Sequence, residues 1–130
     1  REYIEMIRIA IDPKRFDFGI KKASTVRKLG YEVAFNVMYL SKWIDDNSFL
    51  KKLNGVEKHV DYLYLVDSYG SVYPKDINRV VKKIRLITPV KLGFHGHNNM
   101  ELALANSIEA VSCGVEIIDN CYPKDRNYKK

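Results

Sequence analysis

The residues best suited to chemistry in this chain of 130 amino acids are two histidines, His95 and His97, which end an apolar run. Successive side chains of a β-strand point to opposite faces, so the two imidazoles share one face and lie about 6.5–7 Å apart along it. Imidazoles placed in this way can bind one metal ion. Gly93 and Gly96 leave room around them, and the helical pattern that follows places the pair where a strand ends and a helix begins. Ligands of α/β proteins bind at that end of the sheet.

Two histidines do not by themselves define a metal site. A catalytic zinc ion normally has three protein ligands, and harder cations also require oxygen donors. The alternative is structural, with one imidazole bonded to a backbone group and the other exposed to water. The surrounding sequence has to distinguish these two interpretations.

Composition indicates one modest domain, because a chain of this length that is 46% hydrophobic can bury a single core. No apolar run approaches the roughly 18–20 residues of a membrane span, and residues 1–5 do not resemble a signal peptide. We therefore expect a soluble, cytoplasmic protein with no membrane partner. Cys113 and Cys121 lack Cys-x-x-Cys spacing and are expected to be reduced thiols.

The formal charge of +6 raises the question of a nucleic-acid partner. The lysines and arginines are spread along helical faces and do not cluster with interleaved aromatic residues, so we expect no such partner. Residues 122–130 are locally basic and lack apolar periodicity. We therefore expect a domain over residues 1–121 followed by a basic tail or loop.

Apolar periodicity predicts strands that alternate with helices along the chain. The predicted strands cover residues 6–11, 31–40, 61–66, 90–97 and 115–118. The predicted helices cover residues 15–29, 48–53, 74–87 and 100–113. This order argues for consecutive βαβ units and a parallel α/β sheet. Units of about 28 residues suit a (β/α)8 barrel of the TIM type, which usually needs around 250 residues, so the chain supplies roughly half of one.

At its polar strand exits the chain resembles the metal-dependent aldolases of the 4-hydroxy-2-oxovalerate aldolase type, within the wider group of HMG-CoA-lyase-like TIM-barrel enzymes. The resemblance runs from about Met6 to Asp119. Three segments carry the resemblance, and they follow one another in the family's order. They are residues 66–71 (VDSYGS), with Asp76 and Ile77 after them, residues 93–99 (GFHGHNN) and residues 104–111 (LANSIEAV).

The resemblance implies a partial TIM barrel that comprises about strands four to eight. It implies that His95 and His97 bind a divalent cation, commonly Mn²⁺ or Mg²⁺, and that Ser68 lies near a small 2-oxo acid substrate. The family's cation holds the 2-oxo acid and stabilises the enolate that forms as the carbon–carbon bond breaks. The implied products are pyruvate and an aldehyde.

The chain also departs from the family pattern. The remaining metal carboxylate, an arginine and the catalytic histidine come from the first barrel strand, and no matching Arg-Asp-Gly segment is present in these 130 residues. The catalytic residues are therefore unknown. Two other readings stay open, namely an acyl-CoA lyase or Claisen-type condensing enzyme of the same superfamily, and a non-catalytic half-barrel that acts as an interaction module.

Several polar residues at the strand exits have structural alternatives. Ser68 can cap a turn, and Asp67 can accept hydrogen bonds from backbone N–H groups. Asn98 or Asn99 can cap the next helix, and we favour Asn99, which could also orient the His97 ring. Cys121 has no base nearby in the sequence, so we expect no nucleophilic role for it.

A half-barrel has consequences for metal binding and assembly. We expect the isolated chain to bind Mn²⁺ or Mg²⁺ weakly, and softer ions such as Zn²⁺ or Ni²⁺ more tightly, because it offers two nitrogens without a matching carboxylate. The first and last strands become unpaired edges, and the inward side chains lose their partners across the barrel. The side chains expected inward are Leu63, Leu65, Val33, Phe35 and Val37, or their alternates. We therefore expect a homo-oligomer, aggregation, or association with the missing barrel half.

Overall fold

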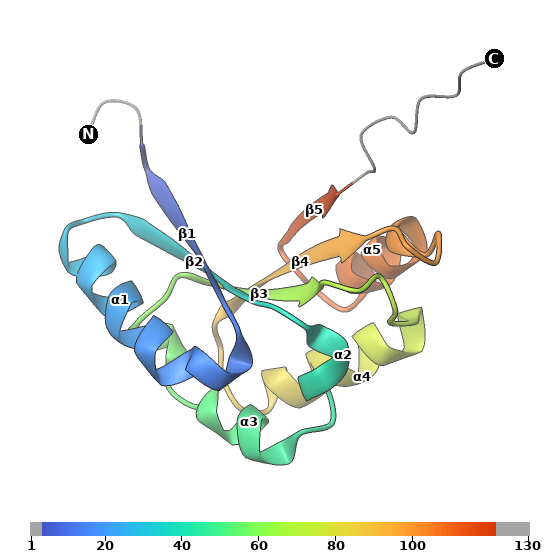
Figure 1. Ribbon diagram of the computed structural model, residues 1–130, viewed down its shortest axis with the longest axis horizontal. Coiled ribbons are helices and arrows are strands. Elements are labelled where there is room, and N and C mark those ends of the chain that lie inside the picture. Colours follow the sequence, from blue (N-terminus) through green and yellow to red (C-terminus); the bar gives the residue numbers. More distant parts are fainter. Residues whose placement is uncertain (1–3, 122–130) are drawn as a thin grey trace.

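Five strands form one parallel sheet in the order of the sequence, as the alternating pattern predicts. The computed structural model describes residues 4–121, so the expected basic tail lies outside the described residues. The strands are β1 (Met6–Ile11), β2 (Glu32–Val37), β3 (Tyr62–Asp67), β4 (Lys91–His97) and β5 (Ile117–Cys121). The sheet curves, with β1 and β5 at its two edges (Figure 1). This is the partial α/β barrel that the sequence predicts.

Helices follow the strands and pack on one face of the sheet (Figure 1). They are α1 (Phe16–Lys28), α2 (Leu40–Trp43), α3 (Asn47–Lys52), α4 (Pro74–Arg85) and α5 (Ala103–Ser112), with 3-10 turns η1 (Pro13–Arg15) and η2 (Val56–Lys58). Local chemistry explains several of the helix starts. Asp46 caps α3 because its carboxylate accepts the Phe49 N–H at 3.0 Å, and Pro74 occupies the first turn of α4. Among residues 4–121, none of these helices is long and apolar enough to cross a membrane.

Three element boundaries differ from the predicted ones by three residues, and the others by no more than two. The strand predicted to reach Leu40 ends at Val37, because Tyr39 adopts a left-handed conformation with φ of 62° and Leu40 begins α2. The helix predicted from Met100 begins at Ala103, because Glu101 is also left-handed, with φ of 58°. The last strand is shifted toward the carboxyl end and covers residues 117–121.

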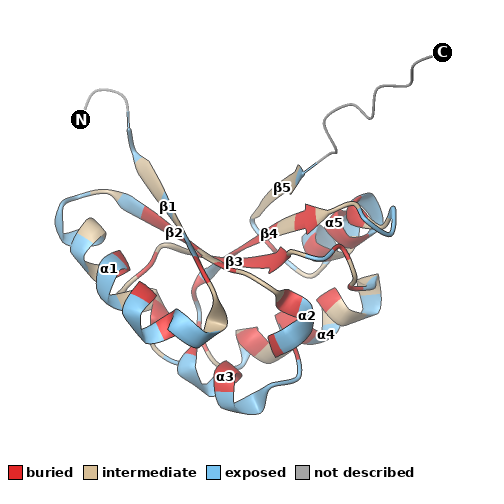
Figure 2. Ribbon diagram, viewed as in Figure 1, coloured by how far each residue is buried: buried red, intermediate tan, exposed pale blue. Residues whose placement is uncertain are grey.

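The two faces of the sheet have different environments. The face toward the helices carries the main core, and Figure 2 shows buried residues concentrated where sheet and helices meet. Its strand residues include Val33, Phe35, Val37, Leu63, Leu65, Leu92 and Phe94. Our expectation that Leu63 and Leu65 point into the barrel is therefore wrong, and on β2 the alternates of Val33, Phe35 and Val37 face inward. Both faces of these strands are apolar, so alternation alone could not tell the two sides apart.

The opposite, concave face is formed by the alternate residues. Ala34, Tyr64 and Val66 are buried there, and Met6, Tyr62 and Ile117 pack against them. Gly93 belongs to this arrangement, because a Cβ built on it would lie 2.6 Å from the Tyr64 ring. The glycine that we expected to leave room for the histidines thus leaves room for a buried tyrosine of the neighbouring strand.

Candidate functional site

The carboxyl ends of the strands bring the predicted site residues together on the concave side of the sheet. His95 and His97 end β4, and Ser68 follows β3 directly. They line a cavity of about 350 Å³ together with Arg8 of β1, Asn36 of β2 and Tyr39. The structure therefore places the three residues singled out as metal or substrate ligands around one space.

The two histidines point their Nε2 atoms toward one another. These atoms are 3.2 Å apart, and the rings meet nearly edge to face, with centroids 5.0 Å apart. His97 Nδ1 lies 2.9 Å from the backbone carbonyl oxygen of Ser68, and His95 Nδ1 bonds to the carboxylate of Asp119. A carbonyl or carboxylate oxygen only accepts, so each Nδ1 donates its hydrogen bond, and a ring that carries its proton on Nδ1 alone presents the lone pair of its Nε2.

This arrangement fits a metal ion. Two nitrogen donors about 2.1 Å from one ion, at angles between octahedral and tetrahedral values, lie about 3.0–3.4 Å apart. The observed 3.2 Å falls within that range, and two facing lone pairs repel one another unless a cation or a proton lies between them. Within residues 4–121, no group of three His, Cys, Asp or Glu side chains could hold a metal. The two histidines are thus candidate metal ligands, and the described residues add no third one.

Ser68 has a structural role beside its place on the cavity wall. Its Oγ accepts the backbone N–H of Tyr39 at 2.9 Å, and its carbonyl oxygen accepts the proton of His97 Nδ1. Tyr39 is the residue in the left-handed conformation, which costs free energy for a non-glycine residue. Ser68 therefore links the orientation of His97 to the strained turn after β2, and its hydroxyl proton remains available to a substrate.

We expect Ser68→Ala to lower the free energy of unfolding by about 1–2 kcal/mol, because the half-buried Tyr39 N–H loses its acceptor. Denaturant unfolding measures this loss. Ser112→Ala is the matched control, since the Ser112 hydroxyl bonds only locally on exposed α5, and its effect should stay within about 0.5 kcal/mol. Equal stability of the two variants would contradict the role assigned to the Ser68 hydroxyl.

Asp67 accepts hydrogen bonds from backbone N–H groups, which is the structural role that the sequence allowed. The side chain is fully buried and accepts backbone N–H groups of Ser71 at 3.0 Å and Val72 at 3.4 Å. Burial raises the pKa of this carboxyl above its ordinary value, and the hydrogen bonds partly oppose the rise. Asp67 thus shapes the turn that presents Ser68.

Asn99 does not cap the following helix, so that expectation is wrong. The helix begins four residues later, and Asn98 accepts the Ala103 N–H at 3.1 Å through its side-chain oxygen. Asn99 is exposed, and the carbonyl of Ser68 already holds the Nδ1 of His97. The backbone of Asn99 instead packs closely against Gly70, where an added Cβ would lie 2.7 Å from the Asn99 nitrogen.

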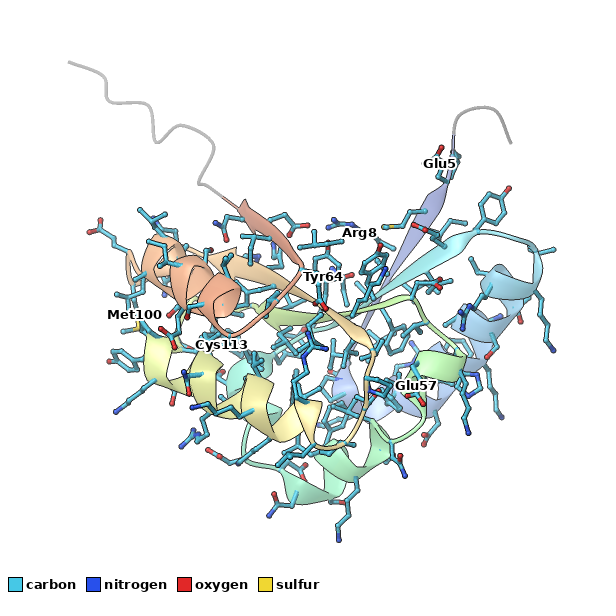
Figure 3. All side chains as sticks on the ribbon, turned by 180° about the vertical axis from the view of Figure 1, so that it is seen from behind. Glu5, Arg8, Glu57, Tyr64, Met100 and Cys113 are labelled. Carbon is cyan, nitrogen blue, oxygen red and sulfur yellow. The ribbon has the colours of Figure 1, made fainter. Side chains whose placement is uncertain are left out.

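Asp119 and Arg8 are site residues that the sequence analysis missed. The Asp119 carboxylate contacts both His95 and the guanidinium of Arg8, which also donates to the Tyr64 hydroxyl at 3.0 Å. Figure 3 shows Arg8 and Tyr64 side by side on the concave side of the sheet. Burial raises the pKa of Tyr64, and the Arg8 charge opposes that rise. Alternation offered a signal, since Asp119 is two residues after inward-facing Ile117.

Tyr39, which lines the same cavity, forms an aromatic pair with Tyr69. Tyr39 and Tyr69 stack with ring centroids 5.4 Å apart, and the Lys42 ammonium lies 5.1 Å and 5.3 Å from the two centroids. A hydrogen bond to Tyr69 is the main cause that raises the pKa of Lys42. This pair comes from the loops after β2 and β3, and sequence spacing did not indicate it.

The chain is similar to one protein family and to individual members of it. The HMGL-like family model matches residues 14–122. The 4-hydroxy-2-oxovalerate aldolase of Chloroflexus aurantiacus is 31% identical over 120 residues, which are 91% of this chain and 34% of that protein. The oxaloacetate decarboxylase of Mycobacterium tuberculosis is 28% identical over 118 residues, 91% of this chain and 35% of that protein.

Solved structures agree on the architecture. The N-terminal domain of a candidate aldolase from Bacteroides vulgatus is 46% identical with a TM-score of 0.86, covering 90% of this chain and 40% of that one. The carboxyl transferase domain of Rhizobium etli pyruvate carboxylase shares the fold, with 18% identity and a TM-score of 0.71 over 89% of this chain and 21% of that one.

The chain spans about a third of the length of the curated relatives it matches, which agrees with the half-barrel that the structure shows. The match to the family model extends from the turn after β1 to the end of β5, and so includes both histidines and Asp119. On these grounds the chain belongs to the HMGL-like family, whose relatives here include aldolases and lyases of carbon–carbon bonds.

Proposed function

We propose that this chain forms the second half of the barrel of a divalent-metal-dependent aldolase, which cleaves 4-hydroxy-2-oxo acids to pyruvate and an aldehyde. The observation that carries the proposal is the pair of Nε2 atoms 3.2 Å apart at the carboxyl end of β4. The relatives named 4-hydroxy-2-oxovalerate aldolase support the choice of substrate. Mn²⁺ or Mg²⁺ is the proposed cation.

His95 and His97 would hold the cation, which when bound stabilises negative charge that develops on the keto oxygen of a 2-oxo acid. The rings need no rearrangement, because Asp119 and the Ser68 carbonyl already fix both Nδ1 atoms. The Ser68 hydroxyl can donate to a substrate oxygen while it accepts from Tyr39. The proposal assigns the third metal ligand and the catalytic base to the rest of the barrel.

Arg8 and Asn36 give the cavity further polar character. The Arg8 guanidinium lines the cavity and remains about half exposed, so it can attract a carboxylate. Asn36 Oδ1 is buried without a hydrogen-bond partner among the described residues, and Asn36 also lines the cavity. An unpaired buried acceptor costs free energy unless a donor reaches it, so a substrate hydroxyl is a suitable partner.

A second candidate is a decarboxylase that acts on oxaloacetate. The relative from Mycobacterium tuberculosis with that name favours it, at an identity similar to those of the aldolases. Both reactions break the bond between C3 and C4 of a 2-oxo acid and leave the enolate of pyruvate. The same pair of histidines would serve either reaction, and the outer part of the cavity would decide between them.

The test measures the cleavage products that the intact protein forms with added Mn²⁺, which are pyruvate from the 2-oxo acids and acetyl-CoA from the thioester. Three substrates are compared, namely 4-hydroxy-2-oxopentanoate, oxaloacetate and an acyl-CoA thioester such as HMG-CoA. Pyruvate with a stoichiometric aldehyde supports the aldolase, and pyruvate from oxaloacetate alone supports the decarboxylase. Cleavage of the thioester alone supports the acyl-CoA lyase alternative. Failure on all substrates, with no divalent-metal binding, would favour the non-catalytic interaction module.

A further inference from the structure

A chain of polar contacts crosses the concave face from one edge of the sheet to the other. Arg8 lies on β1, and Asp119 lies on β5 at the opposite edge. One carboxylate oxygen of Asp119 pairs with Arg8, and the other bonds to His95 Nδ1. The guanidinium lies 4.7 Å from the centroid of the Tyr64 ring and donates to the Tyr64 hydroxyl.

The geometry points to Asp119 as a positioning residue of the metal site, held in place by Arg8. Its function is to keep the proton of His95 on Nδ1, so that Nε2 presents a lone pair to a cation. This inference rests on the proposed function for its biological meaning, since a fixed lone pair matters only if a cation binds. The hydrogen bond itself exists without any metal.

The reason that Asp119 matters lies in the alternative tautomer of His95. His97 has no such freedom, because a backbone carbonyl accepts from its Nδ1. His95 without Asp119 could carry its proton on Nε2, which lies 3.2 Å from the free Nε2 of His97. The two rings would then form a hydrogen bond with each other and occupy the donor atoms that a cation needs. Asp119 disfavours this hydrogen bond between the two rings.

The position of the network in the sheet supports a role inside the barrel. Arg8, Tyr64 and Asp119 come from β1, β3 and β5, which are alternate strands. Side chains from alternate strands form the layers that fill a TIM barrel. Arg8 is still 47% exposed here, and closure of the barrel would shield this salt bridge from water and strengthen its hold on the imidazole. Exposure of the Asp119 side chain is already reduced to 30% in the half-barrel.

The test uses the intact protein with Asp119→Ala and Asp119→Asn, and measures two properties. The ¹⁵N chemical shifts of His95 in the metal-free protein report its tautomer, and calorimetry with Mn²⁺ and with Zn²⁺ reports metal affinity. We expect Asp119→Ala to shift His95 toward the Nε2–H tautomer and to weaken metal binding by about 10–100-fold. Asp119→Asn retains an acceptor oxygen and should have a smaller effect on both.

Asp45→Ala is the matched control, because it removes the same charge from an exposed carboxylate that pairs with Arg79 and Lys83 on α4. Its metal affinity should stay within about twofold of the parent. Unchanged His95 shifts in folded Asp119→Ala protein would overturn the inference, whatever the metal results, and so would an Asp119→Asn protein whose shifts move as far as those of Asp119→Ala. A parent protein that binds no divalent cation would instead overturn the proposed function, and the tautomer measurement would still decide the role of Asp119.

Discussion

His95→Ala in the intact protein is expected to abolish tight binding of Mn²⁺ or Mg²⁺ and to lower kcat/KM for a 4-hydroxy-2-oxo acid by about 10³-fold or more. The variant removes one of the two Nε2 donors that face each other at 3.2 Å. A catalytic metal contributes several kcal/mol of charge stabilisation in the transition state, and each 1.36 kcal/mol corresponds to a tenfold change in rate. Calorimetry and steady-state kinetics on the same preparation measure the two losses.

His59→Ala is the control for loss of a histidine as such. The His59 ring lies outside the site cavity, where its Nδ1 is 2.7 Å from the Ser24 hydroxyl. We expect its metal affinity and kcat/KM to stay within about twofold of the parent at equal folded fraction. A His95→Ala protein that kept sub-micromolar Mn²⁺ binding would show that the cation site lies elsewhere, and the proposed function would lose its main support.

Sequence alone could predict the histidine pair because both rings lie on one strand. A period of two fixes their common face, and the strand end fixes their place at the site. Asp119 and Arg8 are different, because their contacts depend on the register and curvature of the sheet. His95 pairs in register with Asp119 on β5, and no local pattern in the sequence states that register.

Backbone conformation set a second limit to prediction. Tyr39 and Glu101 adopt left-handed conformations that side chains disfavour, so propensity argues against the turns that they form. The turn at Tyr39 is stabilised by the Ser68 hydroxyl from another strand exit, which is a tertiary contact. Propensity therefore predicted a strand that continues to Leu40 and a helix that begins at Met100. In the structure the left-handed Tyr39 lies just after the end of the strand, and the left-handed Glu101 lies just before the start of the helix.

The isolated 130-residue chain is expected to form a dimer, a larger assembly or an aggregate. Within residues 4–121, β1 pairs only with β2 and β5 only with β4, so each presents an unpaired edge with free N–H and C=O groups. The concave face contributes less than we expected from sequence, because Tyr64 and Val66 are already buried in the half-barrel. A group of exposed apolar side chains lies elsewhere, on a single helix face.

That exposure lies on α5, where apolar side chains recur at i, i+4 and i+7. Leu104, Ile108 and Val111 are 64%, 63% and 58% exposed, while α4 covers the other side of the helix through contacts such as that of Asn78 with Glu109. Covering roughly 500 Å² of apolar surface contributes about 12 kcal/mol at about 25 cal/mol per Å². This is comparable to the roughly 4–15 kcal/mol that association costs, and pairing of the two strand edges adds to it.

Sedimentation of the isolated chain at micromolar concentration tests the expectation, with Leu104→Lys/Ile108→Lys as the variant that removes the apolar stripe. We expect the parent chain to sediment as a dimer or larger species, and the variant to shift toward smaller species, because charged residues on α5 oppose contact there. Leu86→Lys is the matched control, since Leu86 is 89% exposed just after α4 and outside the stripe. A compact parent monomer that unfolds cooperatively would contradict the prediction, because it would mean that neither the strand edges nor the α5 stripe needs a partner.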